Sequence, residues 1–284
     1  MIKILIDSAS DIEQEEAERM GVCMIPMEVL FGKEVYLDGV NLSHRQFYEK
    51  LIENDVIPKT SQINEFRWGD TFEKLTQSGD QVIAITISSK LSGTFACAKK
   101  AAKRFVGQVF VVDSLNAATG ERLLCEYALR LIKEGLDAYT VVRELDEKKK
   151  KVQVLAVVDT LKYLRKGGRI SGVVAFAGEM LSVKPVVSVI DGEVKLVGKA
   201  VGSKRSNNLL MQLVEKCGGI DFSMPYGLMY SGLSDEYLKK YLHDSAALWR
   251  DHVSDPDEIP TRLIGSTIGT HVGPNAVGVA FFSK

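Results

Sequence analysis

The chain has few of the residues that build metal sites, cofactor sites or disulfide frameworks. Its four cysteines, Cys23, Cys97, Cys125 and Cys217, are widely spaced and form no CxxC pair, which argues against zinc binding and against disulfides. No group of His, Asp and Glu has the spacing of metal ligands. We therefore expect a protein of the reducing cytoplasm that carries no metal and no cofactor.

Phosphate-binding signatures and long hydrophobic runs are also missing. There is no Walker A loop, and no G-x-G-x-x-G follows a predicted strand, so a nucleotide site lacks its usual support. A net charge of −1 gives no basic footprint for nucleic acid. Two aspartates interrupt the N-terminal apolar run, and residues 172–190 are broken by charges and a proline. We expect no signal peptide and no membrane-spanning helix, which needs about 20 apolar residues.

The residues that are present indicate an α/β protein of two domains. A chain of 284 residues with 45% apolar and 26% charged residues is ordinary for globular proteins and long enough for two domains. Runs rich in Val and Ile at residues 2–6, 82–87 and 109–112 alternate with helical patterns, which is typical of a parallel sheet. Two capping boxes, Ser10 with Glu13 and Ser43 with Gln46, predict helix starts.

The second half of the chain follows a different pattern. Residues 186–190 and 193–197 flank Asp191-Gly192, a pair typical of a type I′ turn, and so predict a β-hairpin. Antiparallel pairing implies a second domain with a mixed or antiparallel sheet. We therefore expect an N-terminal α/β domain over residues 1–159 and a C-terminal α/β domain over residues 160–284.

Three predicted strands end in short polar loops, at residues 7–8, 88–92 and 113–114. Ligands of parallel α/β sheets bind at the carboxyl ends of the strands, so these loops predict a common ligand crevice. Ser92 lies at the predicted N-cap of a helix, and Gly93 allows close approach of the backbone, which makes this loop a candidate anion cradle.

Two further loops supply polar groups that could hold a ligand. One is the hydroxyl-rich loop at residues 58–62, and the other, at residues 265–276, is rich in glycine and hydroxyls and contains His271. Such groups suit holding a carboxylate or phosphate. The alternative is a serine hydrolase or acyltransferase with Ser92, His271 and Asp7 as a triad, although no G-x-S-x-G elbow occurs. The remaining histidines are expected at the charged surface: His44, His243 and His252.

Several short motifs together resemble the DegV family of bacterial fatty-acid-binding proteins. They occur in the family's order and cover nearly the whole chain. They are DSASD (7–11), IPMEV (25–29), KTSQ (59–62), SSKLSGT (88–94), DS (113–114), LRKGGRIS (164–171), KP (184–185) and GTHVGP (269–274).

The resemblance implies two interlocked α/β domains, the first Rossmann-like, with a long-chain fatty acid such as palmitate, stearate or oleate buried between them. The positions that match the family's carboxylate site are Thr60, Ser61, Ser92, Gly93 and His271. Ala118 and Glu121 depart from the pattern, since the family often has Ser and an apolar residue there.

The resemblance also implies a partner, because some members of the family are FakB-like subunits of a bacterial fatty acid kinase. Such a subunit is a lipid carrier and not an enzyme by itself, and a separate kinase phosphorylates the held carboxylate to an acyl phosphate. Arg169 and Arg205 match arginines implicated in docking this kinase. The alternative for both arginines is a solvated basic surface.

Overall fold

The segments predicted as alternating strands form a parallel sheet. The computed structural model describes residues 1–54, 56–170 and 183–284. Within them a four-stranded sheet has the order β2-β1-β6-β7, with every neighbouring pair parallel. Its strands are β1 (Ile2–Asp7), β2 (Cys23–Ile25), β6 (Gln81–Thr86) and β7 (Val109–Asp113). The parallel sheet predicted for the N-terminal half is therefore confirmed.

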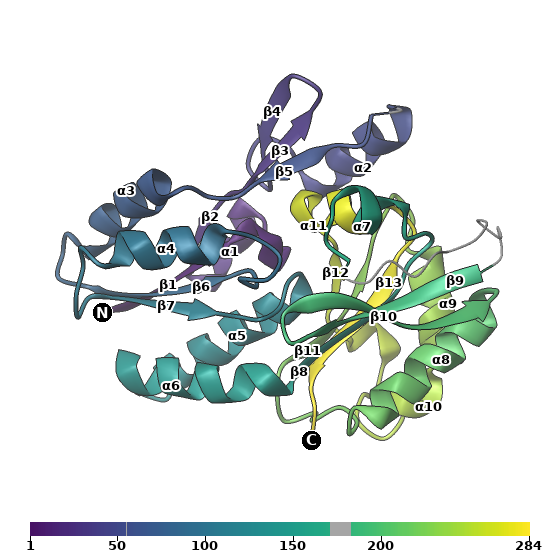
Figure 1. Ribbon diagram of the computed structural model, residues 1–284. Helices are drawn as coiled ribbons and strands as arrows, with labels where there is room; N and C mark the ends of the chain where they lie inside the picture. The colour runs from purple at the N-terminus through teal and green to yellow at the C-terminus, as the bar shows by residue number, and fades with distance from the viewer. Residues whose placement is uncertain (55, 171–182) are drawn as a thin grey trace.

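Helices cover both faces of this sheet, because its strand residues alternate between two buried sides. On one side, α3 (Glu65–Thr76) and α4 (Thr94–Ala102) pack on Leu5 and Ala84. On the other side, α5 (Thr119–Lys133) and α6 (Ala138–Lys148) pack on Ile4 and Ile83 (Figure 1). A further helix, α1 (Gln14–Met20), lies between β1 and β2 in the chain.

A six-stranded mixed sheet forms the second half of the molecule, in the order β10-β9-β8-β13-β11-β12. The hairpin of β9 and β10 turns through Asp191 (φ 53°) and Gly192 (φ 83°), so the predicted turn with two positive φ angles is confirmed. The strands are β8 (Val152–Val157), β9 (Val183–Ile190), β10 (Glu193–Val201), β11 (Tyr226–Tyr230), β12 (Thr261–Leu263) and β13 (Val277–Phe282). The mixed sheet predicted for the C-terminal half is confirmed.

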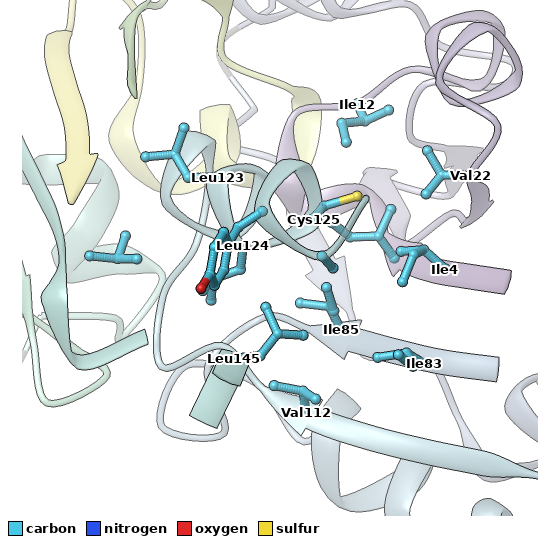
Figure 2. Close-up of a cluster of buried hydrophobic side chains, with 14 of the residues drawn as sticks. Ile4, Ile12, Val22, Ile83, Ile85, Val112, Leu123, Leu124, Cys125 and Leu145 are labelled. Carbon is cyan, nitrogen blue, oxygen red and sulfur yellow. The ribbon is translucent and has the colours of Figure 1, made fainter. Parts of the chain in front are cut away.

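Helix α5 joins the two sheets, since it packs against strands of both. Figure 2 shows its residues Leu123, Leu124 and Cys125 among side chains of the first sheet such as Ile85 and Val112. The same buried cluster includes residues of the mixed sheet. The two halves therefore share one core. Strand β8 lies before the predicted domain boundary at residues 159/160, yet it pairs with β9 and β13 of the mixed sheet. The boundary itself stays a prediction.

The outer face of the mixed sheet is covered by three helices (Figure 1). These are α8 (Ser203–Lys216), α9 (Glu236–Asp244) and α10 (Ala246–Trp249). Three short 3-10 turns complete the described elements: η1 (Ser8–Ser10), η2 (Lys149–Lys151) and η3 (Pro256–Glu258).

A small antiparallel sheet stands apart from the two large ones (Figure 1). It has the order β4-β3-β5, from β4 (Glu34–Leu37), β3 (Glu28–Phe31) and β5 (Lys59–Ser61). Near it lie α2 (His44–Glu53), α7 (Lys162–Lys166) and α11 (Ser266–Val272). The loops predicted at residues 58–62 and 265–276 thus contain a strand and a helix, respectively.

Of the two predicted capping boxes, one is confirmed and one is wrong. Ser43 and Gln46 form both reciprocal hydrogen bonds at the start of α2. Ser10 instead lies in a 3-10 turn and donates its hydroxyl to the carbonyl of Asp7, and α1 begins after Glu13 without a side-chain cap. The tight turn after β1 competes with the helix start for the Ser10 side chain.

Candidate functional site

An apolar cavity lies where the end of the parallel sheet meets the mixed sheet. Its empty space, counting the part that opens to solvent, amounts to about 870 Å³. Most of its wall is aliphatic, with contributions from the loop after β6, from β8 and β9, and from α11: Ile87, Leu91, Val154, Val187, Ile268 and Val272 are examples. Such walls suit an apolar ligand body.

Polar side chains from four separate segments gather in one part of this wall. Thr60 of β5, Ser92 of the loop before α4, Arg169 beyond α7 and His271 of α11 all line the cavity. The Oγ1 of Thr60 lies 2.9 Å from the Nε2 of His271. These residues are far apart in the sequence, and the structure brings together three of the five predicted carboxylate ligands.

The positive charge of this polar group comes from Arg169. Its Nε donates to the carbonyl of Leu91 at 3.3 Å, and its Nη1 donates to the carbonyl of Gly167. Burial, followed by the nearby Arg169 charge, lowers the pKa of His271 to about 4. His271 is therefore neutral at pH 7 and acts through hydrogen bonds. The arrangement can hold an anion with two hydroxyls, an imidazole and a guanidinium.

The other two predicted ligands lie beside the cavity and do not line it among the residues the structure describes. Ser61 follows Thr60 in β5, so its side chain points to the opposite face of the strand. Gly93 is the N-cap of α4, one residue later than the predicted Ser92 cap, and a Cβ there would overlap the amide of Gln62. The roles of Ser61 and Gly93 at a carboxylate stay predictions.

The two arginines predicted to dock a kinase occupy different environments. Arg169 is half-buried at the polar end of the cavity, whereas Arg205 is exposed near the start of α8. Arg205 does not appear in the described lining of the cavity. The docking role stays a prediction for both arginines, and Arg169 also lines the apolar cavity.

The polar strand ends do not form the common crevice that the sequence predicts, because most of their groups tie loops together. Asp7 accepts hydrogen bonds from the amides of Ala9 and Ile87, at 3.0 and 2.9 Å. The Ser88 hydroxyl donates to the Gly192 carbonyl at 2.7 Å and so links the hairpin of the mixed sheet to the loop after β6. Of the three predicted loops, only that at residues 88–92 reaches the described cavity wall.

Two aspartates that sequence reasoning did not assign to the site hold the helix that carries His271. Asp38 accepts from the amides of Ser266 and Thr267 at 3.0 and 3.1 Å, and Asp11 accepts from the amide of Gly265 at 2.8 Å. These amides begin α11 and need acceptors from outside the helix. From the sequence, the only indication of these contacts is that the first amides of a helix need acceptors, because each aspartate lies more than 220 residues from the amide that it binds.

His44 is a further correction, because it is 5% exposed rather than on the charged surface. Its ring packs close to Gly265, where an added Cβ would lie 2.8 Å from Nε2. His44 therefore helps to enclose the N-terminal end of α11.

Burial changes the protonation of two carboxyl groups near this helix. Desolvation raises the pKa of Asp7 to about 7 and that of Asp11 to about 8, although backbone amides oppose the shift. The folded chain therefore retains protons on these groups at a pH where the unfolded chain has released them.

We expect the stability of the fold to fall as the pH rises from 7 to 8.5. Raising the pH favours the state that binds fewer protons, which for Asp7 and Asp11 is the unfolded chain. Urea midpoints at the two pH values will differ less in Asp11→Asn, whose amide cannot titrate and tolerates the left-handed backbone at φ 62°. An equal pH slope in both proteins would contradict this assignment.

A serine–histidine–aspartate triad is not assembled in this structure. The Ser92 hydroxyl lies 2.9 Å from the Thr94 hydroxyl, and His271 bonds to Thr60. The Nδ1 of His271 is buried without a partner among the described residues, so no carboxylate orients the ring. A pKa of about 4 also makes His271 a weak base.

Over residues 1–54, 56–170 and 183–284, no group of three or more His, Cys, Asp and Glu side chains is placed to hold a metal ion. In the same part of the chain no helix has the length and hydropathy to cross a bilayer.

Comparison with known proteins gives matches over the full length. A family model described as "Uncharacterised protein, DegV family" matches residues 1–284. The DegV domain-containing protein TTE1491 of Caldanaerobacter subterraneus subsp. tengcongensis is 32% identical over 285 residues, which cover 100% of this chain and 99% of that protein.

Solved structures with the same fold include proteins described by the fatty acids they bind. One is a DegV family protein from Thermus thermophilus described by its fatty acid binding, with a TM-score of 0.83, 28% identity and coverage of 100% of this chain and 99% of that one. Another is a stearic acid-binding protein from Eubacterium ventriosum, with a TM-score of 0.84, 26% identity and coverage of 99% and 97%. The full-length family match and the shared architecture confirm the resemblance seen in the motifs: this chain belongs to the DegV family.

Proposed function

We propose that this protein binds a long-chain fatty acid such as palmitate, stearate or oleate in the apolar cavity. The observation that carries the proposal is an aliphatic cavity with one polar end, where Thr60, Ser92, Arg169 and His271 meet. The carboxylate lies at that end and accepts hydrogen bonds from the two hydroxyls, with Arg169 supplying the opposite charge. Relatives of the same fold that bind fatty acids support this assignment.

The acyl chain supplies most of the affinity in this arrangement. Each methylene buried against the cavity wall contributes about 0.8 kcal/mol. Part of this gain is offset by the lost freedom of a flexible ligand. Ser61 assists through its backbone, because the pairing of β5 with β3 fixes the adjacent Thr60. Gly93 assists through its close contact with Gln62, which fixes the adjacent Ser92.

We further propose that the protein is a cytoplasmic carrier and presents its lipid to a separate fatty acid kinase. The kinase would transfer a phosphoryl group to the held carboxylate and form an acyl phosphate. Arg169, at the polar end, and the exposed Arg205 are the proposed docking residues. In this scheme the chain has no catalytic residue of its own.

Mass spectrometry of lipids extracted from the denatured protein tests the proposal directly. We expect stoichiometric acyl chains to copurify with the protein, and delipidated protein to bind palmitate or oleate. A preparation that is free of lipid and also fails to bind either acid would refute it. A serine hydrolase would instead be shown by labelling of Ser92 with a fluorophosphonate probe and by ester turnover.

A further inference from the structure

A threonine hydroxyl without a partner lies in the cavity wall, away from the proposed carboxylate end. Thr267 of α11 lines the cavity and is 2% exposed, and its Oγ1 has no hydrogen bond among the described residues. Thr267 and His271 are four residues apart on this helix, so they share a face and lie about 6 Å apart along its axis. The hydroxyl therefore belongs to a part of the wall that is about one helical turn beyond the polar end.

The place of Thr267 in its helix explains why the helix supplies no partner. A helical threonine can donate to the carbonyl four residues earlier, as Thr270 does to Ser266 at 2.9 Å. Thr267 is the second residue of α11, and the residue four positions before it, Leu263, ends strand β12. An unpaired buried hydroxyl is unfavourable, and a helical threonine has two accessible χ1 rotamers. A polar group on a bound ligand would therefore satisfy the Thr267 hydroxyl.

A second side chain without a partner, that of Glu121, lies beside the same part of the cavity. It is fully buried, and neither carboxyl oxygen has a hydrogen bond among the described residues. Glu121 is the third residue of α5, and helical side chains lean toward the N-terminal end of their helix, where Ala117 and Ala118 line the cavity. Burial, followed by the charge of Asp7, raises the pKa of Glu121 well above its ordinary value, so its carboxyl is protonated at pH 7.

The first turns of α5 and α11 meet at one aspartate, which brings these two side chains to the same region. Asp11 accepts from the amide of Gly265, directly before α11, at 2.8 Å. The backbone amide of Thr119, at the start of α5, lies close enough to Asp11 to lower its pKa. Thr267 and Glu121 therefore border one region of the cavity, which we call the inner polar site.

We propose that the inner polar site binds a hydroxyl group on an interior carbon of the acyl chain, so that the protein prefers a long-chain hydroxy fatty acid to the unsubstituted acid. The proposal rests on the proposed function, because the carboxylate of both ligands lies at the same polar end. A hydroxyl has one donor and two acceptor lone pairs, so it can pair with the Thr267 hydroxyl and the Glu121 carboxyl at once. A plain hydrocarbon chain, saturated or not, leaves both groups unpaired.

A series of monohydroxystearates, with the hydroxyl on each interior carbon in turn, tests the inference against stearate and oleate on delipidated protein. We expect one isomer, or two adjacent ones, to bind about tenfold more tightly than stearate, because hydrogen bonds form to groups that are otherwise unpaired. The position of the preferred hydroxyl reports how far the inner polar site lies from the carboxylate. Oleate should bind like stearate, since its double bond offers no hydroxyl.

Two pairs of variants assign the preference to the inner polar site. Thr267→Val and Glu121→Leu each remove a polar group, and we expect each to lower the affinity for the preferred isomer by about tenfold without weakening stearate binding. Thr267→Ser and Glu121→Gln keep a donor and an acceptor and should retain the preference. Thr270→Val is the matched control, because this threonine of α11 is equally buried and its hydroxyl is already bonded to Ser266. It should leave both affinities within about twofold.

The outcomes separate failure of this inference from failure of the proposed function. If stearate binds and no hydroxystearate binds more tightly, water rather than ligand pairs with these groups, and the inference alone is wrong. Equal losses for stearate and the preferred isomer in Thr267→Val also contradict it, because the side chain would then act through the shape of the cavity. A preference that survives Thr267→Val but is lost in Ser188→Ala would place the hydroxyl at β9 instead. Absence of binding for every acid overturns the proposed function itself.

Discussion

Replacing Thr60 with valine and Ser92 with alanine in one variant will weaken palmitate binding by about a hundredfold. Both hydroxyls line the polar end of a mostly aliphatic cavity, so their loss leaves the carboxylate without two donors where little water can replace them. A hydrogen bond to a charged group contributes about 1.5 kcal/mol or more, and each 1.4 kcal/mol changes affinity tenfold. Titration calorimetry on delipidated protein measures the change.

Ser61→Ala is the matched control for this variant. It removes a hydroxyl from the same strand, but on the face that does not line the cavity, so palmitate affinity should stay within about twofold. Comparable melting temperatures for the three proteins would show that the change is local. Wild-type affinity in the double variant would mean that the carboxylate lies elsewhere.

The parts of the fold that the sequence predicts correctly are those encoded locally. The parallel strands follow from their Val- and Ile-rich runs, and the β9–β10 hairpin follows from Asp191-Gly192, whose backbone needs positive φ. The Ser43–Gln46 capping box is also local and is confirmed. In each case the residues that determine the structure lie within a few positions of it.

The parts that the sequence does not predict depend on distant partners. Residues 265–276 look like a loop because glycines and hydroxyls disfavour a helix, yet α11 forms there with its first amides bonded to Asp38 and Asp11. Likewise β5 is a strand because it pairs with β3, which local composition does not reveal. Tertiary hydrogen bonds outweigh weak local preferences at both places.

The candidate site shows the same division between local and distant information. The loop at residues 88–94 could be recognised as an anion cradle from its hydroxyls and glycine, and the loops that contain Thr60 and His271 could be recognised as sources of polar groups for a ligand. The family resemblance then identified Thr60 and His271 as carboxylate ligands. The aliphatic walls could not be predicted, because they combine β8, β9 and α11 from different parts of the chain. Glu121, a departure from the family pattern, is fully buried and its two oxygens have no partner among the described residues.

Replacing Asp38 with alanine will lower the free energy of unfolding by about 3 kcal/mol and weaken fatty acid binding. Asp38 is fully buried and accepts from the amides of Ser266 and Thr267, and an unsatisfied buried donor costs about 1–3 kcal/mol. Less repulsion toward Asp7 and Asp11 offsets only part of this loss, because burial is the main cause of their raised pKa. Urea denaturation at pH 7 measures the stability.

The effect of Asp38 on binding is indirect and follows from what α11 carries. Thr267, Ile268 and His271 of this helix line the cavity, so a frayed N-terminal end displaces both wall and ligand groups. Asp38→Asn keeps one oxygen acceptor and should lose about half as much stability. Asp70→Ala, which breaks an exposed pair with Lys74, should change stability by less than about 1 kcal/mol. If Asp38→Ala unfolds at the same urea concentration as Asp70→Ala, these hydrogen bonds do not hold α11 in place.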